Sequence, residues 1–483
     1  MKNNSTICKK PLTRGVLSAL ILLPAFVSAQ ISASGQKITA HQELSRDIFR
    51  ELVEINTTVN IGSTKAAESM AERLKGAGFA ETDINVVGPS ELHKNLVVRL
   101  RGTGTLPPVL FIGHLDVVEA LRQDWSFDPF KFHEFDGYFY GRGTSDIKDE
   151  DADLIANLIR LKKEGFQPDR DIIVALTEDE EGGPANGIQW LINNRRDLIN
   201  AEFCINPDGG GGSMKNGKKT VMAIQTSEKV YRDFKLESRN NGGHSSLPVK
   251  DNAIYHITAA LNNIADHEFP LNLNETSRMF FERNAIQETG QMKADMLAVS
   301  KIPPDTAAAR RLANASPYYN AQMRTTCVAT VISGGHANNA LPQTAVANVN
   351  CRILPGEKAE DVLSILKNIV NDPLVEITFA ATSAPGPLSP LRKDVLEAVD
   401  SITESMWPGV IVTPVMSTGA TDGRRLRIAG IPVYGVSGIF SDDDDVRAHG
   451  KDERIEVNSF YEGVDFMYRL MKELSSVKSR VRE

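Results

Sequence analysis

The sequence predicts an α/β protein, in which a mostly parallel sheet is flanked by helices and a smaller α+β domain is inserted. Apolar runs of strand length alternate with amphipathic helices over roughly the first half of the chain, which is typical of such a sheet. The pattern changes to half-exposed strands after about residue 228 and returns from about residue 385. A chain of 483 residues is also too long for one ordinary core, which favours two domains.

The first part of the chain supplies most of the larger domain. Residues 41–55 repeat apolar side chains at helical spacing, and residues 63–79 repeat the pattern. Apolar runs of strand length follow at 95–100, 109–116, 172–176 and 201–205. Residues 151–165 place a helix between the second and third of these runs. This alternation predicts strands that are buried on both faces.

The inserted domain is expected over residues 229–384. Its strands are predicted at 230–238, 325–335, 345–354 and 374–381, and its helices at 251–267 and 357–370. This β-α-β-β-α-β order is typical of a small α+β sandwich. Residues 270–322 interrupt it with polar, partly helical sequence. Residues 30–228 and 385–483, which include a strand at 431–436 and a closing helix at 458–474, are expected to form the larger domain together.

Composition and the first residues narrow the class of protein. The net charge of -8 gives no electrostatic reason to expect nucleic acid as a partner. Residues 1–29 combine early lysines, the apolar run "GVLSALILLPAFV" and small residues before Ala29, which predicts a cleaved signal peptide. An uncleaved anchor is the alternative, but the run is shorter than the roughly 20 residues of a spanning helix. We therefore expect an exported protein, periplasmic or secreted, that is not held at a membrane.

The cysteines form no recognisable metal motif. Cys8 leaves with the signal peptide, and Cys204, Cys327 and Cys351 remain at wide spacing. Cys327 and Cys351 lie on two predicted strands joined by a short connection. They either form one disulfide or stay as buried thiols.

Imidazoles and carboxylates follow several predicted strands, and ligands of open α/β sheets gather at the carboxyl ends of strands. The candidates are His114 with Asp116, Asp146 in a Gly-flanked turn, Glu180 with Glu181, Asp208, and His449 far downstream. Each has an ordinary structural alternative, as a hydrogen-bonded histidine, a turn or helix-cap acid, or part of a solvated acidic run. Their convergence would suit a divalent metal.

The combination resembles the dizinc amidohydrolase family of aminoacylase, carboxypeptidase S, glutamate carboxypeptidases and succinyl-diaminopimelate desuccinylase. The matching stretches occur in the family's order over nearly the whole mature chain: "GHLDVV", "WSFDPF", "GYFYGRGTSDIKDE", "TEDEEGG", "NPDGG", "GGHSSLP", "NNALPQTAVANVNCRILPGE", "STGATDGRRL" and "RAHGKDE". The resemblance implies a zinc-peptidase-like catalytic domain and an inserted lid or dimerisation domain. It also implies a homodimer through the lid as a possible assembly.

The resemblance assigns roles to individual residues. Asp146 would bridge two metal ions, zinc or else cobalt or manganese, with His114 and Asp208 on one ion and Glu181 and His449 on the other. Glu180 matches the general base, and Asp116 the carboxylate that orients His114. Glu178 and Asp179 are left as solvated or supporting neighbours.

The lid and one loop supply the expected substrate contacts. His244 resembles the histidine that stabilises the tetrahedral oxyanion, often in a neighbouring subunit's site. Arg352 resembles the residue that grips a substrate carboxylate, with Asn339 assisting it, although a surface arginine is the alternative. Gly419 matches a loop that lines the substrate pocket, unless it only serves a turn.

These features predict a metal-dependent hydrolase that cleaves an amide next to a free carboxylate, in a small peptide or an N-acyl amino acid. An aminopeptidase or dipeptidase that reads a free amine is the alternative, and a catalytically silent peptide- or metal-binding protein is another. Two departures bear on the substrate. "GHLDVVEA" lacks the family's usual proline, and the run Asp442 to Asp445, which we interpret as a solvated loop, precedes His449.

Overall fold

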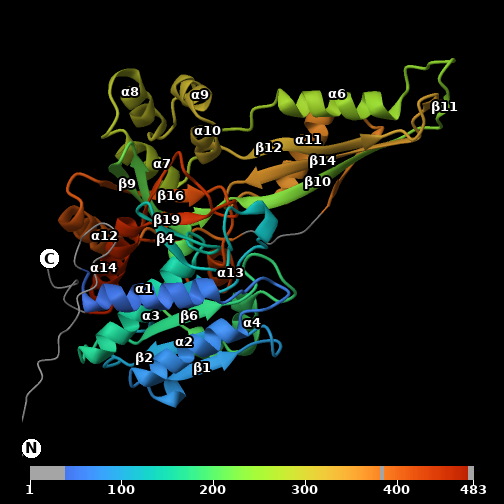
Figure 1. Cartoon of the computed structure of the whole chain (residues 1–483). Helices are drawn as coiled ribbons and strands as arrows, with labels where there is room; N and C mark the ends of the chain where they lie inside the picture. Colours follow the sequence, from blue (N-terminus) through green and yellow to red (C-terminus); the bar gives the residue numbers. More distant parts are fainter. Residues whose placement is uncertain (1–37, 381–385, 477–483) are drawn as a thin grey trace, which may run out of the picture. The chain divides into compact units, whose positions relative to one another are not determined.

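The computed structural model describes residues 38–380 and 386–476, and its helices and strands follow the expected alternation (Figure 1). The predicted signal peptide therefore lies outside the described residues. No helix within the described ranges is both long and apolar enough to cross a membrane.

The larger domain is built on a 6-stranded sheet with the order β1-β2-β6-β3-β7-β17. Strands β6, β3, β7 and β17 are parallel, and β1 and β2 add an antiparallel edge. Every residue of β3 and β6 is buried, as the apolar runs predicted. The strands span β1 Ile84–Val87, β2 Asn95–Leu100, β3 Val109–His114, β6 Ile172–Thr177, β7 Phe203–Ile205 and β17 Val433–Tyr434.

Helices cover both faces of this sheet. On one face α1, α3 and α14 pack against one another, and α3 contacts β3 and β6. On the other face Leu110 and Ile112 join a buried cluster with Leu191 of α4 and Leu426 of α13. The helices span α1 Ala40–Glu54, α2 Thr64–Gly76, α3 Lys148–Lys163, α4 Gly187–Asn194, α5 Arg196–Ile199, α13 Gly423–Ile428 and α14 Val457–Leu474.

Two further sheets of the larger domain were not predicted. The 4-stranded sheet has the order β16-β9-β8-β18, and α12 (Lys393–Met406) packs against β16. The 3-stranded sheet has the order β19-β5-β4 and joins the region after His449 to that before Asp146. Their strands span β4 His133–Phe135, β5 Tyr138–Tyr140, β8 Gly211–Lys215, β9 Lys218–Glu228, β16 Ile411–Ser417, β18 Phe440–Asp442 and β19 Arg454–Glu456.

The inserted segment, which we call the lid, forms an antiparallel 4-stranded sheet with the order β12-β14-β10-β15. Helices α6 and α11 share one buried core with this sheet, and the expected β-α-β-β-α-β order is present. A short pair, β11 (Gly243–His244) with β13 (Ala340–Leu341), lies at the tip of the long strands (Figure 1). The other elements span β10 Val230–Arg239, α6 Ala253–Ala265, β12 Thr326–Gly334, β14 Thr344–Ile353, α11 Ala359–Val370 and β15 Val375–Phe379.

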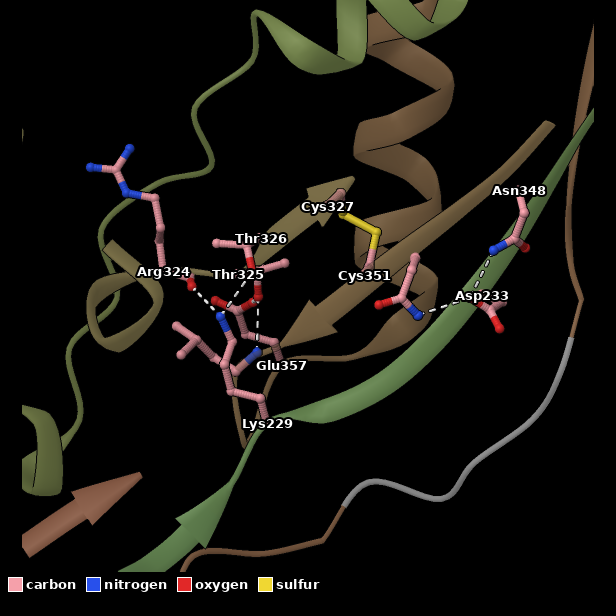
Figure 2. Close-up of a disulfide and its surroundings, with 11 residues drawn as sticks. Lys229, Asp233, Arg324, Thr325, Thr326, Cys327, Asn348, Cys351 and Glu357 are labelled. Carbon is pink, nitrogen blue, oxygen red and sulfur yellow. Dashed lines mark hydrogen bonds between the residues drawn. A yellow bond between two sulfur atoms is a disulfide. The ribbon is translucent and has the colours of Figure 1, made fainter. Parts of the chain in front are cut away.

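Cys327 and Cys351 form a disulfide between facing residues of β12 and β14 (Figure 2). Of the two alternatives that the sequence left open for this pair, the structure has the disulfide. Cys204 is a buried free thiol.

The sequence that interrupts the lid forms helices with a core of their own. Phe280, Phe281 and Leu312 contribute to this core, and α7 packs against β16 of the larger domain. The helices span α7 Glu275–Asn284, α8 Gly290–Val299, α9 Thr306–Ala315 and α10 Pro317–Met323.

Candidate metal centre and active site

Asp146 lies between two histidines in the turn that precedes α3. Its Oδ1 is 3.2 Å from His114 Nε2, and its Oδ2 is 3.0 Å from His449 Nε2. Gly143 allows this turn, because its φ is 87° and a Cβ there would lie 2.9 Å from the Lys148 side chain. The two oxygens of one carboxylate therefore face two imidazoles that are far apart in the sequence.

His114 and Asp208 complete the first group of possible metal ligands. His114 ends β3, and its Nδ1 lies 3.1 Å from the backbone oxygen of Asp116, which leaves Nε2 directed to Asp146. Asp208 lies in the turn that follows β7. One ligand atom from each of His114, Asp146 and Asp208 lies within 4.8 Å of the others.

Glu181 and His449 form the second group around Asp146. His449 comes from the loop between β18 and β19, where its φ of 62° is left-handed. Its Nε2 lies 2.6 Å from Glu181 Oε1, and one ligand atom from each of Asp146, Glu181 and His449 lies within 4.8 Å of the others. Asp146 thus belongs to both groups, which is the position that a bridging ligand would take.

Asp116 fixes the turn that carries Glu180 and Glu181. Its Oδ1 accepts the Glu180 N–H at 3.1 Å, and its Oδ2 accepts the Glu181 N–H at 3.0 Å. Its Oδ1 lies 3.7 Å from His114 Nδ1, so the expected contact with His114 is made instead by the Asp116 backbone oxygen. The carboxylate of Asp116 holds the backbone of the two glutamates.

The crowding of acids at this site shifts their pKa values. Burial, with the nearby Asp422, Asp208 and Glu181 carboxylates, raises the pKa of Glu180 to about 9. Burial also raises the pKa of Asp208 to about 7. The hydrogen bond with Asp146 raises the pKa of His449 to about 9. Without added positive charge, Glu180 would hold a proton and His449 would be charged at neutral pH.

These residues fit a pair of divalent cations. Two bound cations would favour ionised carboxylates and neutral imidazoles, which reverses each of the shifts described above. Imidazole nitrogens and carboxylate oxygens are also the donor set that suits Zn²⁺ and similar ions. The shared carboxylate of Asp146 is the arrangement that places two ions close together.

Comparison with known proteins identifies the family. Residues 110–473, well over half of the chain, match the profile of peptidase family M20/M25/M40. The chain belongs to this family.

Two relatives are similar in sequence to this member of the M20/M25/M40 family. The human N-fatty-acyl-amino acid synthase/hydrolase is 30% identical over 388 residues, covering 76% of this chain and 74% of that protein. A probable carboxypeptidase S-like protein of Dictyostelium discoideum is 28% identical over 380 residues, covering 76% and 72%.

The solved structures show the same fold at lower identity. A metallo-carboxypeptidase of Sulfolobus solfataricus aligns with a TM-score of 0.64 at 16% identity, covering 89% of this chain and 98% of that one. A Bacillus subtilis peptidase described as dinuclear metal binding aligns with a TM-score of 0.57 at 12% identity, covering 90% and 99%. The chain is a metal-dependent hydrolase of amide bonds, as its motifs predicted.

Two residues that sequence reasoning missed tie the halves of the M20 site together. Glu453 is buried and accepts the Ser145 N–H at 2.8 Å, and its other oxygen binds Arg142. Arg142 also donates to the backbone oxygen of His449 at 3.3 Å. Both residues lie inside the quoted motifs, but nothing in the sequence showed that they are buried and paired with each other. They hold the Asp146 turn against the His449 loop.

Asp422 is another buried acid that the sequence did not single out. Its Oδ1 accepts from Asn186 at 2.6 Å, and its Oδ2 accepts from Thr177 Oγ1 at 3.3 Å. It thereby links the loop after β16 to the end of β6 and to the start of α4. Its place within "STGATDG" was the only available signal.

The structure brings His244 and Asn339 together at the lid tip. His244 pairs with Ala340, and the backbone oxygen of Asn339 accepts the Ser245 N–H at 3.1 Å. The base of β10 is fixed where the Lys229 N–H donates to the Ser417 oxygen. The 10 residues of β10 place the tip about 30 Å from that base. His244 and Asn339 are both exposed at this tip.

Arg352 lies at the opposite end of the lid, beside the loop that contains Gly419. It donates to the Thr418 backbone oxygen at 2.9 Å and lies over the Tyr231 ring at 4.8 Å. Eight positions of β14 separate Arg352 from Thr344, about 26 Å of strand, so Asn339 does not assist Arg352 within one chain. Joint action of the two residues on one substrate therefore stays a prediction. A Cβ on Gly419 would meet only Ser417 Oγ at 3.5 Å, so packing does not enforce glycine there.

The acidic run before His449 is only partly a solvated loop. Asp443 and Asp444 are exposed, but Asp445 accepts from Arg447 Nε at 2.6 Å and from Arg454 Nε at 2.8 Å. Asp445 therefore anchors the loop that delivers His449.

Proposed function

We propose that this chain hydrolyses the amide bond of N-acyl amino acids or small peptides in which that bond lies next to a free carboxylate. The observation that carries the proposal is the position of Asp146 between two imidazoles, with Glu180 on an adjoining fixed turn. One relative is named as an acyl-amino acid hydrolase and the other as carboxypeptidase-like, and both names support this class of substrate. They give less support to an enzyme that reads a free amine.

We assign one cation to His114, Asp146 and Asp208, and a second to Asp146, Glu181 and His449. Zinc is the proposed ion because this donor set suits it, and cobalt or manganese would accept the same residues. When bound, two such ions polarise the scissile carbonyl and lower the pKa of water.

Glu180 is the proposed general base. Its backbone is fixed by Asp116, while its side chain lies among the carboxylates of the site. It would accept a proton from the attacking water and pass it to the leaving nitrogen. Asp116 acts as a positioning residue, because its hydrogen bonds fix the backbone from which both glutamate side chains extend.

His244 is the proposed oxyanion donor, in the site of a second copy of the chain. The Ser246 N–H donates to His244 Nδ1 at 3.2 Å, so the neutral ring carries its proton on Nε2. That N–H is suited to a developing negative charge. The tip's distance from the base of β10 supports action across a homodimer. The edge strand β12, which exposes Val328 and Val331 at 60% and 61%, supports pairing through the lid.

Arg352 is the proposed site for the substrate carboxylate. One of its nitrogens donates to Thr418, and stacking on Tyr231 holds the guanidinium plane. Its remaining donors suit a carboxylate in a two-pronged hydrogen bond. The Gly419 loop then forms the adjoining wall of the pocket, and residues 229–384 act as one lid and dimerisation domain.

We further propose that the protein is exported, with cleavage after Ala29, and works in the periplasm or outside the cell without a membrane anchor. The disulfide between Cys327 and Cys351 supports an oxidising compartment.

A substrate panel tests the proposed function. N-acyl amino acids, dipeptides and their C-terminal amides would be offered to the mature protein with and without a chelator. We expect turnover of free-acid substrates that the chelator abolishes and added zinc restores. Turnover that survives complete metal removal, or a preference for the amides, would contradict the proposal.

An arginine variant sharpens this test. Replacing Arg352 by Ala should raise KM about 10-fold or more for free-acid substrates, because a charge-assisted hydrogen bond is lost, and should leave KM for the amides nearly unchanged. Arg239→Ala, an arginine of the same sheet that is 78% exposed, serves as the control. Equal effects on acids and amides would remove Arg352 from carboxylate binding.

A further inference from the structure

A third group of metal-ligating side chains lies next to the catalytic turn. His93, in the loop before β2, places its Nδ1 at 2.9 Å from Glu178 Oε2 and at 3.2 Å from Asp179 Oδ1. One ligand atom from each of these residues lies within 4.8 Å of the others. Within residues 38–380 and 386–476, the only other groups that meet this condition are the two that share Asp146.

The distances in this group match those of the catalytic groups. The contacts of Asp146 and Glu181 with their histidines measure 2.6 to 3.2 Å, and those of His93 measure 2.9 and 3.2 Å. Ligand atoms around a tetrahedral zinc ion lie about 3.3 Å apart, since each is about 2.0 Å from the metal. The three side chains therefore need little movement to share an ion.

Burial supplies an independent reason to expect a ligand here. The Glu178 side chain is 0% exposed, and its Oε1 accepts no hydrogen bond from any residue that the structure describes. The adjacent Asp179 side chain is 2% exposed. Two neighbouring buried acids beside one imidazole leave negative charge without compensation, which is costly in a protein interior. Either a proton or a cation must balance it.

The contacts of Asp179 direct one of its two carboxylate oxygens toward His93. The Ala185 N–H occupies Asp179 Oδ2 at 3.2 Å, which leaves Oδ1 toward His93. A Cβ on Gly183 would lie within 2.2 Å of the Asp179 carboxylate oxygens, so glycine gives this side chain its place. His93 is 12% exposed, which offers an entry route.

We propose that His93, Glu178 and Asp179 bind a third divalent cation of the zinc class, separate from the catalytic pair. Asp179 directly precedes Glu180, so this ion would join the loop before β2 to the turn that carries the general base. The role of this ion is structural. It would hold the turn through the residues that precede Glu180, whereas Asp116 holds the turn through the N–H groups of Glu180 and Glu181. His93 is then a positioning residue, not a catalytic one.

His256 provides a matched control. It also contacts two carboxylates, but Asp372 meets its Nδ1 at 2.6 Å and Asp251 meets its Nε2 at 3.1 Å. Because the two acids lie at opposite ring nitrogens, one ion cannot be shared by all three residues. Removing His256 should therefore change no metal content.

The test is the zinc content of the mature protein, measured by elemental analysis after dialysis against a low zinc concentration. We expect three zinc ions per chain in the wild type and in His256→Ala, and two in His93→Ala and Glu178→Gln. Glu178→Gln keeps the side-chain shape, so it answers the question if His93→Ala fails to fold. Circular dichroism checks the fold of each variant.

Two results would overturn the proposal. Two zinc ions in the wild type would mean that a proton balances Glu178, whose pKa burial and the Asp179 carboxylate raise to about 9. Three ions in folded His93→Ala would place the extra ion elsewhere. Neither result affects the catalytic pair, whereas a wild type that binds no zinc at all would count against the proposed function itself.

Discussion

In the proposed mechanism, Glu180 and Glu181 have different tasks although they are neighbours in the sequence. Glu181 Oε1 lies 2.6 Å from His449 Nε2, while Glu180 makes no ion pair with a histidine of the described residues and lies among carboxylates. Asp116 holds both backbone N–H groups. In the proposed mechanism, the directions in which the two side chains leave this fixed turn separate the metal ligand from the proton carrier.

The Glu180→Gln variant tests this separation. The amide keeps the shape but cannot accept the proton, so kcat should fall by about 10³-fold, while the two catalytic ions remain bound. Stopped assays with an N-acyl amino acid, together with elemental analysis, measure both quantities. A loss of one ion would show that Glu180 is itself a ligand, and near-normal kcat would remove it from proton transfer.

Among elements, helix α6 of the lid is tied at its first turn by His256. The hydrogen bond with Asp372 raises the pKa of His256, and the contact with Asp251 adds to this. A raised pKa in the folded state means that folding is favoured where the histidine is charged. This contribution is fully present below the unfolded value of about 6.5 and is lost as pH rises through the raised value.

The His256→Ala variant should therefore lose more stability at pH 6 than at pH 9. Urea unfolding of wild type and variant at both pH values, followed by circular dichroism, gives the two differences. An equal loss at both pH values would mean that packing of the ring, and not its charge, stabilises α6.

The elements also show where sequence reasoning succeeds and fails. Fully buried strands such as β3 and β6 can be predicted from their continuous apolar runs. Strands β8 and β9 do not, because glycine and lysine dominate "GGGGSMKNGKK". Their hairpin had a signal nonetheless: Asn216 and Gly217 have φ values of 52° and 72°, as a two-residue turn between paired Lys215 and Lys218 requires.

The site residues were predictable as a set because motif order carries more information than any single residue. The distances could not be foreseen, since they depend on long-range pairing such as that of Asp146 with His449. The burial of Glu178 was also missed, because four acids in a row look solvated. The loop before β2, which carries His93, supplies a partner for the buried Glu178 side chain.

For the whole molecule, the lid geometry predicts that activity needs two copies. Subunits carrying His244→Ala and subunits carrying Glu180→Gln should each be inactive alone. When they are co-expressed, half of the dimers are mixed and each of these has one intact site, so about one quarter of wild-type activity should return. Dimers purified through two different tags are all mixed, so they should show about one half of the wild-type activity per dimer. No recovery would place the oxyanion donor elsewhere.

The hydrogen bond between Glu453 and the Asp146 turn affects when the site can form during protein synthesis. In the proposed second ligand group, Asp146 and Glu181 come from the first half of the chain, whereas His449 lies far later in the sequence, close to Glu453. A ribosome-bound chain cannot complete this site until His449 and Glu453 have emerged.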